Sequence, residues 1–152
     1  MARAGTTTAF LTESGMLEEW SSTTLDLEAN QIAWYRGNSA VNYEGGVECS
    51  DWYAEALTCG THPVAQKEPN DWGLYDVTGN VWELVWDWAG DYPDPGSSVV
   101  DPLGPETGSA RRMRGGAFAS AGQYLRVAYR TGMAPHGRWN NIGFRLVRNV
   151  AP

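Results

Sequence analysis

The chain has 152 residues and a formal net charge of −7. It is long enough to bury a hydrophobic core as one domain, and its 42% hydrophobic and 12% aromatic residues argue against a disordered chain. The negative charge argues against nonspecific binding to nucleic acid or to an anionic membrane, so we expect neither partner. Eight tryptophans and eighteen glycines favour a loop-rich β or α+β domain over a helical bundle.

The chain shows no targeting or membrane segment. No apolar run reaches the length that a membrane-spanning helix needs. The first residues, MARAGTTTAF, lack the long apolar core of a signal peptide. We expect a soluble chain that does not span a membrane, and its compartment stays open. We find no repeat and no boundary, which predicts a single domain over residues 1–152.

The first sixty residues predict few regular elements. Residues 15–20 form a candidate helix, because Ser14 can cap it and Glu18 and Glu19 favour its N-terminal half. Residues 32–35 are a short apolar and aromatic run, which predicts a strand. Residues 38–60 contain many turn formers, which predicts an irregular segment.

The two cysteines, Cys49 and Cys59, lie within this irregular segment. If they are joined, the short loop would stabilise the fold by about 3 kcal/mol on the chain-entropy model. Two free thiols in a reducing compartment are the alternative, and no sequence feature decides between the two states. A zinc site would need further ligands, and only His62 lies near, so we do not expect one.

Residues 81–88 carry an alternating strand pattern. Every second side chain is large and apolar, which predicts one aromatic, buried face. That face holds Trp82, Leu84, Trp86 and Trp88. Residues 91–108 follow with several prolines and glycines, which predict a loop.

Three further strands are predicted in the last third of the chain, over residues 113–118, 125–130 and 143–148. Residues 131–141 contain Pro135 and Gly137, which indicate a turn between the second and third strands. The arginines from Arg111 onward make this third locally basic. We expect them to be paired framework residues.

Three stretches form specific motifs: ARAGTTTAF at residues 2–10, THPVAQKEPNDWGLYDVTGNVWE at residues 61–83, and RGGAF with GFRLVR in the last third. Through these motifs the chain resembles the family of the formylglycine-generating enzyme, the sulfatase-modifying factor. The resemblance covers nearly the whole chain, which starts late relative to the family. It implies an α+β, C-type-lectin-like fold with small twisted antiparallel sheets, few short helices and much ordered loop.

The chain lacks the catalytic residues of the family that it resembles. The family enzyme uses a pair of cysteines after the Gly-Gly pair, and the matching places hold Ser120 and Leu125. Serine is a poor substitute for a thiolate, and leucine neither binds copper nor forms a disulfide. Related iron oxygenases need a cluster of histidines and carboxylates, and the chain has only His62 and His136. We therefore expect no redox cofactor and no enzyme activity.

The last third also resembles the variable proteins of diversity-generating retroelements, which share this fold. In those proteins a reverse-transcribed template, mutated at adenines, rewrites codons between fixed glycines and arginines, often at asparagine positions. The chain keeps the fixed frame at Arg114, Gly115, Gly116, Leu125, Arg126, Ala128, Arg130, Arg138, Asn141, Ile142, Gly143, Phe144 and Arg145. At the places between, it carries Ala119, Ser120, Ala121, Tyr124, Tyr129, Thr131, Met133, Gly137 and Trp139. Adenine changes in an asparagine codon would give most of these residue types, but not simply tryptophan or methionine.

This second resemblance implies a variable region over residues 113–148, whose surface at residues 117–140 contacts a ligand. Aromatic side chains are the predicted anchors, because they give a large contact area with few rotatable bonds. The predicted ligand contacts are Phe118, Ala119, Ser120, Gln123, Tyr124, Tyr129, Thr131, Met133, His136, Trp139 and Asn140. For Phe118 and Tyr129 the alternative is a place in the core.

The resemblance to the enzyme family also implies a structural calcium site. Its ligands would be the side chains of Asp76 and Glu83 and the main-chain oxygens of Gly79 and Val81. These are the hard oxygen donors that calcium prefers. In the alternative, taken from spacing alone, Asp76 organises the turn and Glu83 pairs with an arginine.

These observations predict a non-enzymatic binding protein that recognises another protein or a cell-surface molecule. A second hypothesis is a catalytically inactive or accessory member of the formylglycine-generating enzyme family that still holds a peptide. A third is a carbohydrate binder, which exposed tryptophan and tyrosine side chains would suit.

Overall fold

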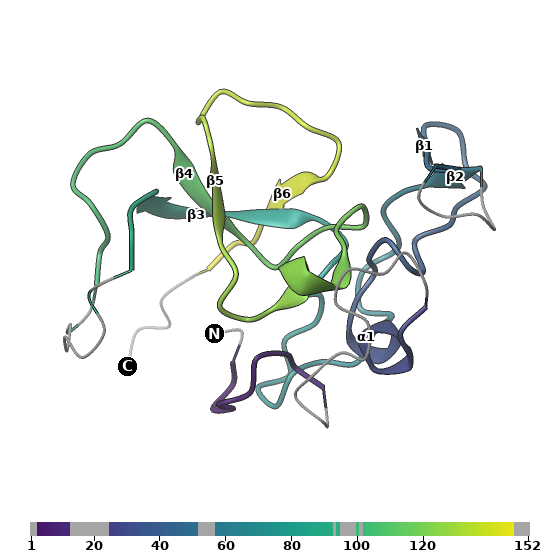
Figure 1. Ribbon diagram of the computed structural model, residues 1–152, viewed down its shortest axis with the longest axis horizontal. Helices are drawn as coiled ribbons and strands as arrows, with labels where there is room; N and C mark the ends of the chain where they lie inside the picture. Colours follow the sequence, from purple (N-terminus) through teal and green to yellow (C-terminus); the bar gives the residue numbers. More distant parts are fainter. Residues whose placement is uncertain are drawn as a thin grey trace.

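A computed structural model describes residues 3–12, 25–51, 57–92, 94, 100 and 102–147. Its regular elements are short and are joined by long loops (Figure 1). They are α1 (Leu27–Ile32), β1 (Val47–Glu48), β2 (Thr58–Cys59), β3 (Trp82–Trp88), β4 (Arg111–Arg114), a 3-10 helix (Gly122–Leu125), β5 (Thr131–Met133) and β6 (Ile142–Phe144). The helix predicted over residues 15–20 lies outside the described residues.

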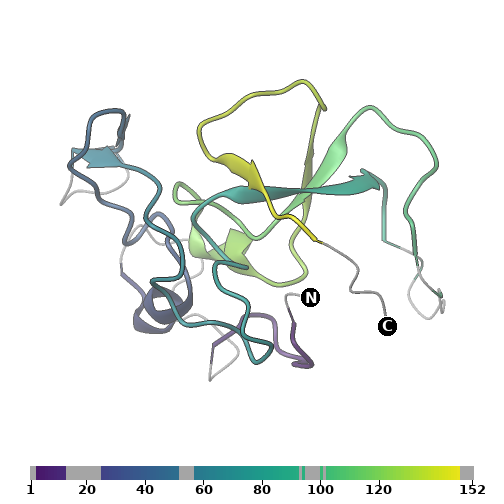
Figure 2. The ribbon, with the colours of Figure 1, turned by 180° about the vertical axis from the view of Figure 1, so that it is seen from behind.

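The strands form two small sheets. β1 pairs with β2, and the larger sheet has the order β5-β4-β3-β6, in which β3 runs antiparallel to β4 and parallel to β6. The larger sheet is therefore mixed and not antiparallel as predicted, whereas β1 and β2 pair antiparallel as predicted. The two sheets lie on opposite sides of the molecule, with α1 below the smaller one (Figures 1 and 2). Nowhere in the described part of the chain is there a helix long and apolar enough for a bilayer.

Helix α1 lies where the sequence predicts no helix. Asp26 caps it, because its Oδ1 accepts a hydrogen bond from the Ala29 amide at 2.8 Å, and Glu28 suits its first turn. Ala29 and Ile32 are its buried residues. The strand predicted over residues 32–35 is wrong, because its first residue ends α1 and the next three form no strand.

Although the chain is rich in tryptophan, the two core clusters of the described residues consist of other side chains. Its main cluster brings together distant parts of the chain, namely Phe10, Ala29, Ile32, Ala33, Tyr35 and Leu125. A second cluster packs Phe118 with Cys49 and Cys59, which the structure joins in a disulfide with Cα atoms 5.8 Å apart. The disulfide therefore lies under the start of the predicted variable region.

Strand β3 confirms the strand predicted over residues 81–88, but its aromatic face is not buried. Trp86 is 87% exposed, and no tryptophan among the described residues is fully buried. The reason lies on the neighbouring strand β4. The guanidinium of Arg111 lies 3.5 Å from the ring centroid of Trp88 and 5.0 Å from that of Trp86. At Trp86 and Trp88 this face therefore meets a cation and solvent instead of the core.

The structure confirms some of the elements predicted in the last third of the chain and contradicts others. β4 and β6 overlap two of the predicted strands, whereas β5 lies in the segment predicted as a turn. The strand predicted over residues 125–130 is wrong, because Leu125 ends the 3-10 helix and is only 1% exposed. The carbonyls of the next residues, 127–129, accept hydrogen bonds from the side chain of Arg114 in place of a neighbouring strand.

Several arginines of the last third act as framework residues, but mostly through carbonyl oxygens. Arg111 and Arg112 donate to main-chain carbonyls of β3 and of the turn after it, and Arg114 donates to those of residues 127–129. Arg145 instead pairs with the carboxylate of Glu83. The framework role was predicted correctly for these four arginines, and Arg145 is the one among them whose partner is a carboxylate.

His62 makes the stability of this fold dependent on pH. Its ring stacks on Trp34 with centroids 3.7 Å apart, and its buried Nε2 has no hydrogen-bond partner among the described residues. Burial, and secondarily the charge of Lys67, hold the pKa of His62 below its ordinary value of 6.5. The folded chain therefore takes up this proton less readily than the unfolded chain. The free energy of unfolding keeps this contribution above pH 6.5 and loses it as the pH falls through the lowered pKa.

We expect urea denaturation from about pH 8 to about pH 5 to show this loss of stability. His62→Gln removes the titrating group, so the variant should lose less stability than the native chain over the same range. His136→Gln changes the other histidine, which is exposed, and should keep the native profile. Equal pH profiles for the native chain and His62→Gln would contradict the account.

Candidate ligand-binding site

The last third of the chain contributes most of an open cleft of about 360 Å³, which we call the C-terminal cleft. Its lining consists of Trp82, Met113, Ala119, Ser120, Tyr124, Tyr129, Thr131, Gly132, Met133, Trp139, Asn141 and Ile142. The loop between β5 and β6, which carries Trp139, arches over the four-stranded sheet beside it (Figure 1). The cleft therefore combines side chains from strands with side chains from loops.

The strand register brings the cleft's sheet residues together. Met113 pairs with Leu84 on one side and with Thr131 on the other, and Trp82 pairs with Ile142. Because alternate residues of a strand share a face, Trp82 lies on the same face as Leu84 and its partner Met113. One face of the sheet therefore presents a continuous surface from β5 across to β6.

Two tyrosines form a packed wall beside this surface. The rings of Tyr124 and Tyr129 meet edge to face with centroids 4.9 Å apart, and Tyr129 lies 5.9 Å from the Trp82 ring. Such aromatic contacts stabilise a defined arrangement of the rings. By contrast, Trp139 is 68% exposed and offers free contact area at the cleft.

Seven of the eleven predicted contact residues line the C-terminal cleft, namely Ala119, Ser120, Tyr124, Tyr129, Thr131, Met133 and Trp139. Gln123, His136 and Asn140 lie outside the lining, and the last two are exposed. Phe118 was predicted wrongly as a contact. It is 2% exposed and packs against the disulfide, so the alternative place in the core is correct for it.

Sequence reasoning missed five lining residues: Trp82, Met113, Gly132, Asn141 and Ile142. Most of them lie in strands, and the parallel pairing of β6 with β3 leaves no local signal in the sequence. Asn141 is notable because its Oδ1 is buried and has no hydrogen-bond partner among the described residues. Asn141 also adds a polar residue to a largely apolar lining.

The two positions that correspond to the family's cysteine pair both serve the fold. Ser120 is 7% exposed, and its Oγ accepts a hydrogen bond from the Ala117 amide at 2.9 Å. Leu125 is packed in the main core cluster. The disulfide of Cys49 and Cys59 belongs to the second cluster and does not line the cleft.

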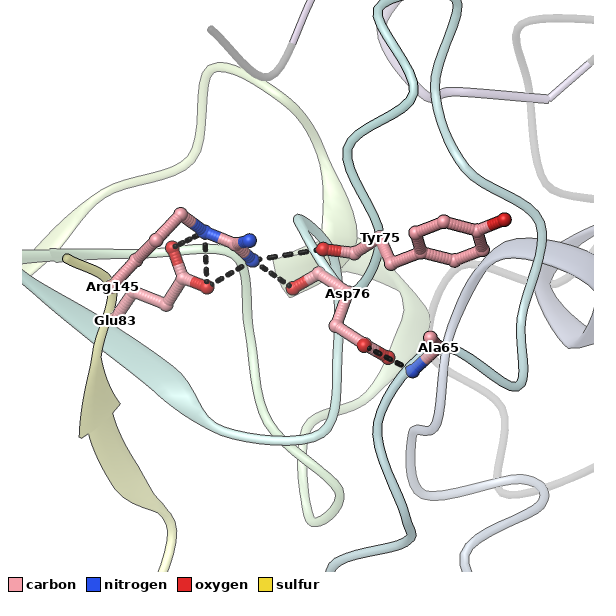
Figure 3. Close-up of polar contacts among 5 residues, drawn as sticks. All are labelled: Ala65, Tyr75, Asp76, Glu83 and Arg145. Atoms are coloured by element: carbon pink, nitrogen blue, oxygen red, sulfur yellow. Dashed lines mark hydrogen bonds and ion pairs between the residues drawn. The ribbon is translucent and has the colours of Figure 1, made fainter. Parts of the chain in front are cut away.

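The four predicted calcium ligands, Asp76, Gly79, Val81 and Glu83, line a second open pocket of about 490 Å³. The guanidinium of Arg145 binds the Glu83 carboxylate in this pocket, with Nη2 2.6 Å from Oε1 (Figure 3). The described part of the chain holds no group of three or more His, Cys, Asp or Glu side chains suited to a metal ion. As arranged here, the residues do not fit a calcium ion, because Arg145 takes the carboxylate. The predicted alternative, an arginine partner for Glu83, describes the observed contact.

The family relationship follows from comparison with known proteins. A model of the family described as the sulfatase-modifying factor enzyme 1-like domain matches residues 18–150. The formylglycine-generating enzyme of Thermomonospora curvata is 44% identical over 117 residues, which cover 72% of this chain and 38% of that protein. The formylglycine-generating enzyme of Streptomyces coelicolor is 42% identical over 100 residues, 64% of this chain and 32% of that protein.

A third relative, serine/threonine-protein kinase pkn1 of Chlamydia pneumoniae, is 36% identical over 135 residues, which cover 87% of this chain and 22% of the relative. The chain therefore spans less than two fifths of the length of these curated relatives.

Solved structures support the same fold. Treponema denticola variable protein 1 matches with a TM-score of 0.66 and 34% identity over 94% of this chain and 41% of that chain. PvdO from Pseudomonas aeruginosa matches with a TM-score of 0.59 and 25% identity over 94% of this chain and 46% of that chain. The small mixed sheets, the near absence of helix and these neighbours confirm the C-type-lectin-like fold. The chain belongs to the sulfatase-modifying factor enzyme 1-like family.

Proposed function

We propose that the chain is a ligand-binding protein whose C-terminal cleft recognises a protein partner, in the manner of the variable proteins of diversity-generating retroelements. The observation that carries this proposal is the gathering of seven candidate variable positions, spread over residues 119–139, around one cleft. The structural similarity to Treponema denticola variable protein 1 supports it.

The chemistry of the lining favours recognition. None of the residues that line the cleft is Cys, His, Lys, Arg, Asp or Glu. The lining instead combines aromatic and aliphatic side chains with a few hydrogen-bonding groups, including those of Thr131 and Asn141. Ligand sites commonly have this composition, in which apolar burial supplies affinity and a few polar groups fix the orientation.

The cleft is also held in place before any ligand arrives. Arg114 donates hydrogen bonds to carbonyls of residues 127–129, and the Trp82 amide donates to the Asn141 carbonyl at 2.8 Å. These contacts join the segment of Tyr129 and the end of the β5–β6 loop to the sheet. Side chains displayed on a fixed backbone bind without a large ordering cost.

The charge distribution favours an acidic partner surface. Residues 107–152 contain eight arginines and no aspartate or glutamate, although the whole chain has a net charge of −7. Electrostatic complementarity of this kind speeds encounter and selects partners more than it adds affinity. The proposal therefore assigns the cleft to an apolar surface of a protein partner, with acidic residues on that partner favoured by the local charge of this part of the chain.

The diversified origin of the cleft is tested on the gene. A near-copy of the codons for residues 113–148 that differs mainly at adenines, beside a reverse transcriptase gene, would support the proposal. A gene neighbourhood that lacks this near-copy and contains a sulfatase gene would instead favour an accessory role in sulfatase maturation.

The second candidate function is that of an accessory formylglycine-generating-enzyme-like domain that holds a peptide. Identities of 42% and 44% to proteins of that name favour it. Incubation with a cysteine-containing peptide tests the difference between binding and catalysis. Catalytic loss of the peptide thiol would contradict the non-enzymatic proposal, whereas an unchanged thiol agrees with it.

A further inference from the structure

Oxygen atoms at the start of β3 and in the turn before it converge on one cation, the guanidinium of Arg145. Its Nε lies 3.1 Å and 3.2 Å from the two carboxylate oxygens of Glu83, and its Nη2 lies 2.6 Å from Oε1. The same Nη2 donates to the main-chain oxygens of Tyr75 at 2.9 Å and Asp76 at 3.1 Å (Figure 3). Two carboxylate oxygens and two carbonyl oxygens therefore surround this positive charge.

The backbone conformation of the turn at Asp76 directs these carbonyl oxygens toward Arg145. Asp76 has a φ of +54°, in the left-handed region that few residues other than glycine adopt. Its carboxylate points away from Arg145, because Oδ2 accepts a hydrogen bond from the Ala65 amide at 2.7 Å (Figure 3). This hydrogen bond fixes the turn, while the carbonyl of the same residue faces the guanidinium.

We propose that Arg145 is the built-in cation of this site and takes the place of a divalent metal ion. A guanidinium matches a carboxylate through two parallel hydrogen bonds, and its remaining donors suit the carbonyls. The side chains of Arg145 and Glu83 are only 28% and 21% exposed, so solvent screens the pair less than a surface ion pair. The chain therefore needs no calcium to hold this turn.

The contact between Arg145 and Glu83 also stabilises the C-terminal cleft. Arg145 follows directly after β6, whose residues pair in parallel with Trp82, Glu83 and Leu84 of β3. Asn141 and Ile142, at the start of this segment, line the cleft. The bond from Arg145 to Glu83 thus holds β6 in register at the strand that forms part of the lining.

The inference predicts how calcium changes the melting temperature of the native chain and of an Arg145 variant. Melting of the native chain should not change when calcium is added or removed with a chelator, because Glu83 is already occupied. Arg145→Met should lower the melting temperature by about 5 °C, on the size expected for a contact of this kind. It also frees the carboxylate of Glu83 and the main-chain oxygens of Tyr75 and Asp76. Calcium should then bind the variant and restore much of the lost melting temperature.

Two variants serve as controls. Arg145→Met combined with Glu83→Gln should lose the response to calcium, because the main carboxylate is gone. Arg138→Met changes an exposed arginine outside the site and should behave as the native chain. Stabilisation of the native chain by calcium would overturn the inference, as would an Arg145→Met variant that folds but shows no calcium response. If Arg145→Met does not fold without metal, refolding with and without calcium gives the same comparison.

Discussion

Replacement of Phe118 with alanine is expected to lower the free energy of unfolding by about 3–5 kcal/mol, the cost of emptying a well-packed aromatic site. The side chain is 2% exposed and packs with Cys49 and Cys59, so the neighbours cannot fill the space easily. The main chain keeps its own anchors, because the Phe118 amide donates to Asn80 and its carbonyl accepts from Ser39. Urea denaturation of both chains measures the difference.

Phe144→Ala is the matched control for this substitution. Phe144 also lies in the predicted variable region, but it is 73% exposed on β6. A surface change of this kind is expected to alter the free energy of unfolding by only about 0.5 kcal/mol. If the two alanine variants lost equal stability, or if Phe118→Ala lost none, Phe118 would not belong to the core.

Removal of the disulfide is expected to have the next largest effect. Cys49 and Cys59 are ten positions apart, and the loop that they close should contribute about 3 kcal/mol on the chain-entropy model. The paired Cys49→Ala and Cys59→Ala variant should therefore unfold at a lower urea concentration than the native chain. Both side chains are fully buried, so the loss of packing adds to the entropic effect.

Addition of a reductant provides the control for the disulfide. It should lower the stability of the native chain and leave the alanine variant unchanged, because only the native chain has a bond to reduce. A native chain that releases two reactive thiols on unfolding without reductant would contradict the disulfide. Because Phe118 contacts both cysteines, the two effects are not expected to add.

Long alternating patterns and specific motifs were the parts of the fold that sequence reasoning could reach. β3 was predicted because residues 81–88 alternate, and the family fold followed from the motifs around it. α1 was missed because it has six residues and depends on one capping contact of Asp26. The strand expected after Leu125 failed because the Arg114 side chain satisfies carbonyls that a neighbouring strand would otherwise bind.

The candidate site shows the same division. Tyr124 of the 3-10 helix and Trp139 of the β5–β6 loop were found from the pattern of fixed and varied residues. Thr131 and Met133 of β5 were found in the same way, whereas four other strand residues were missed, namely Trp82, Met113, Gly132 and Ile142. The pairing of Trp82 with Ile142, for example, joins residues sixty apart in the chain. The burial of Phe118 was also invisible, since its partners Cys49 and Cys59 lie in a segment that reads only as irregular loop.

The central claim is that the C-terminal cleft recognises a partner, and affinity at Trp139 tests it most directly. Peptides selected from a random displayed library on the native chain serve as the probe. Trp139→Ala should weaken their binding by about tenfold or more, as expected when a large aromatic contact residue is removed. Trp72→Ala removes a tryptophan of similar exposure, 62% against 68%, from outside the cleft and should leave the affinity unchanged. Equal affinities for the native chain and Trp139→Ala, or equal losses in the two variants, would contradict recognition by the cleft.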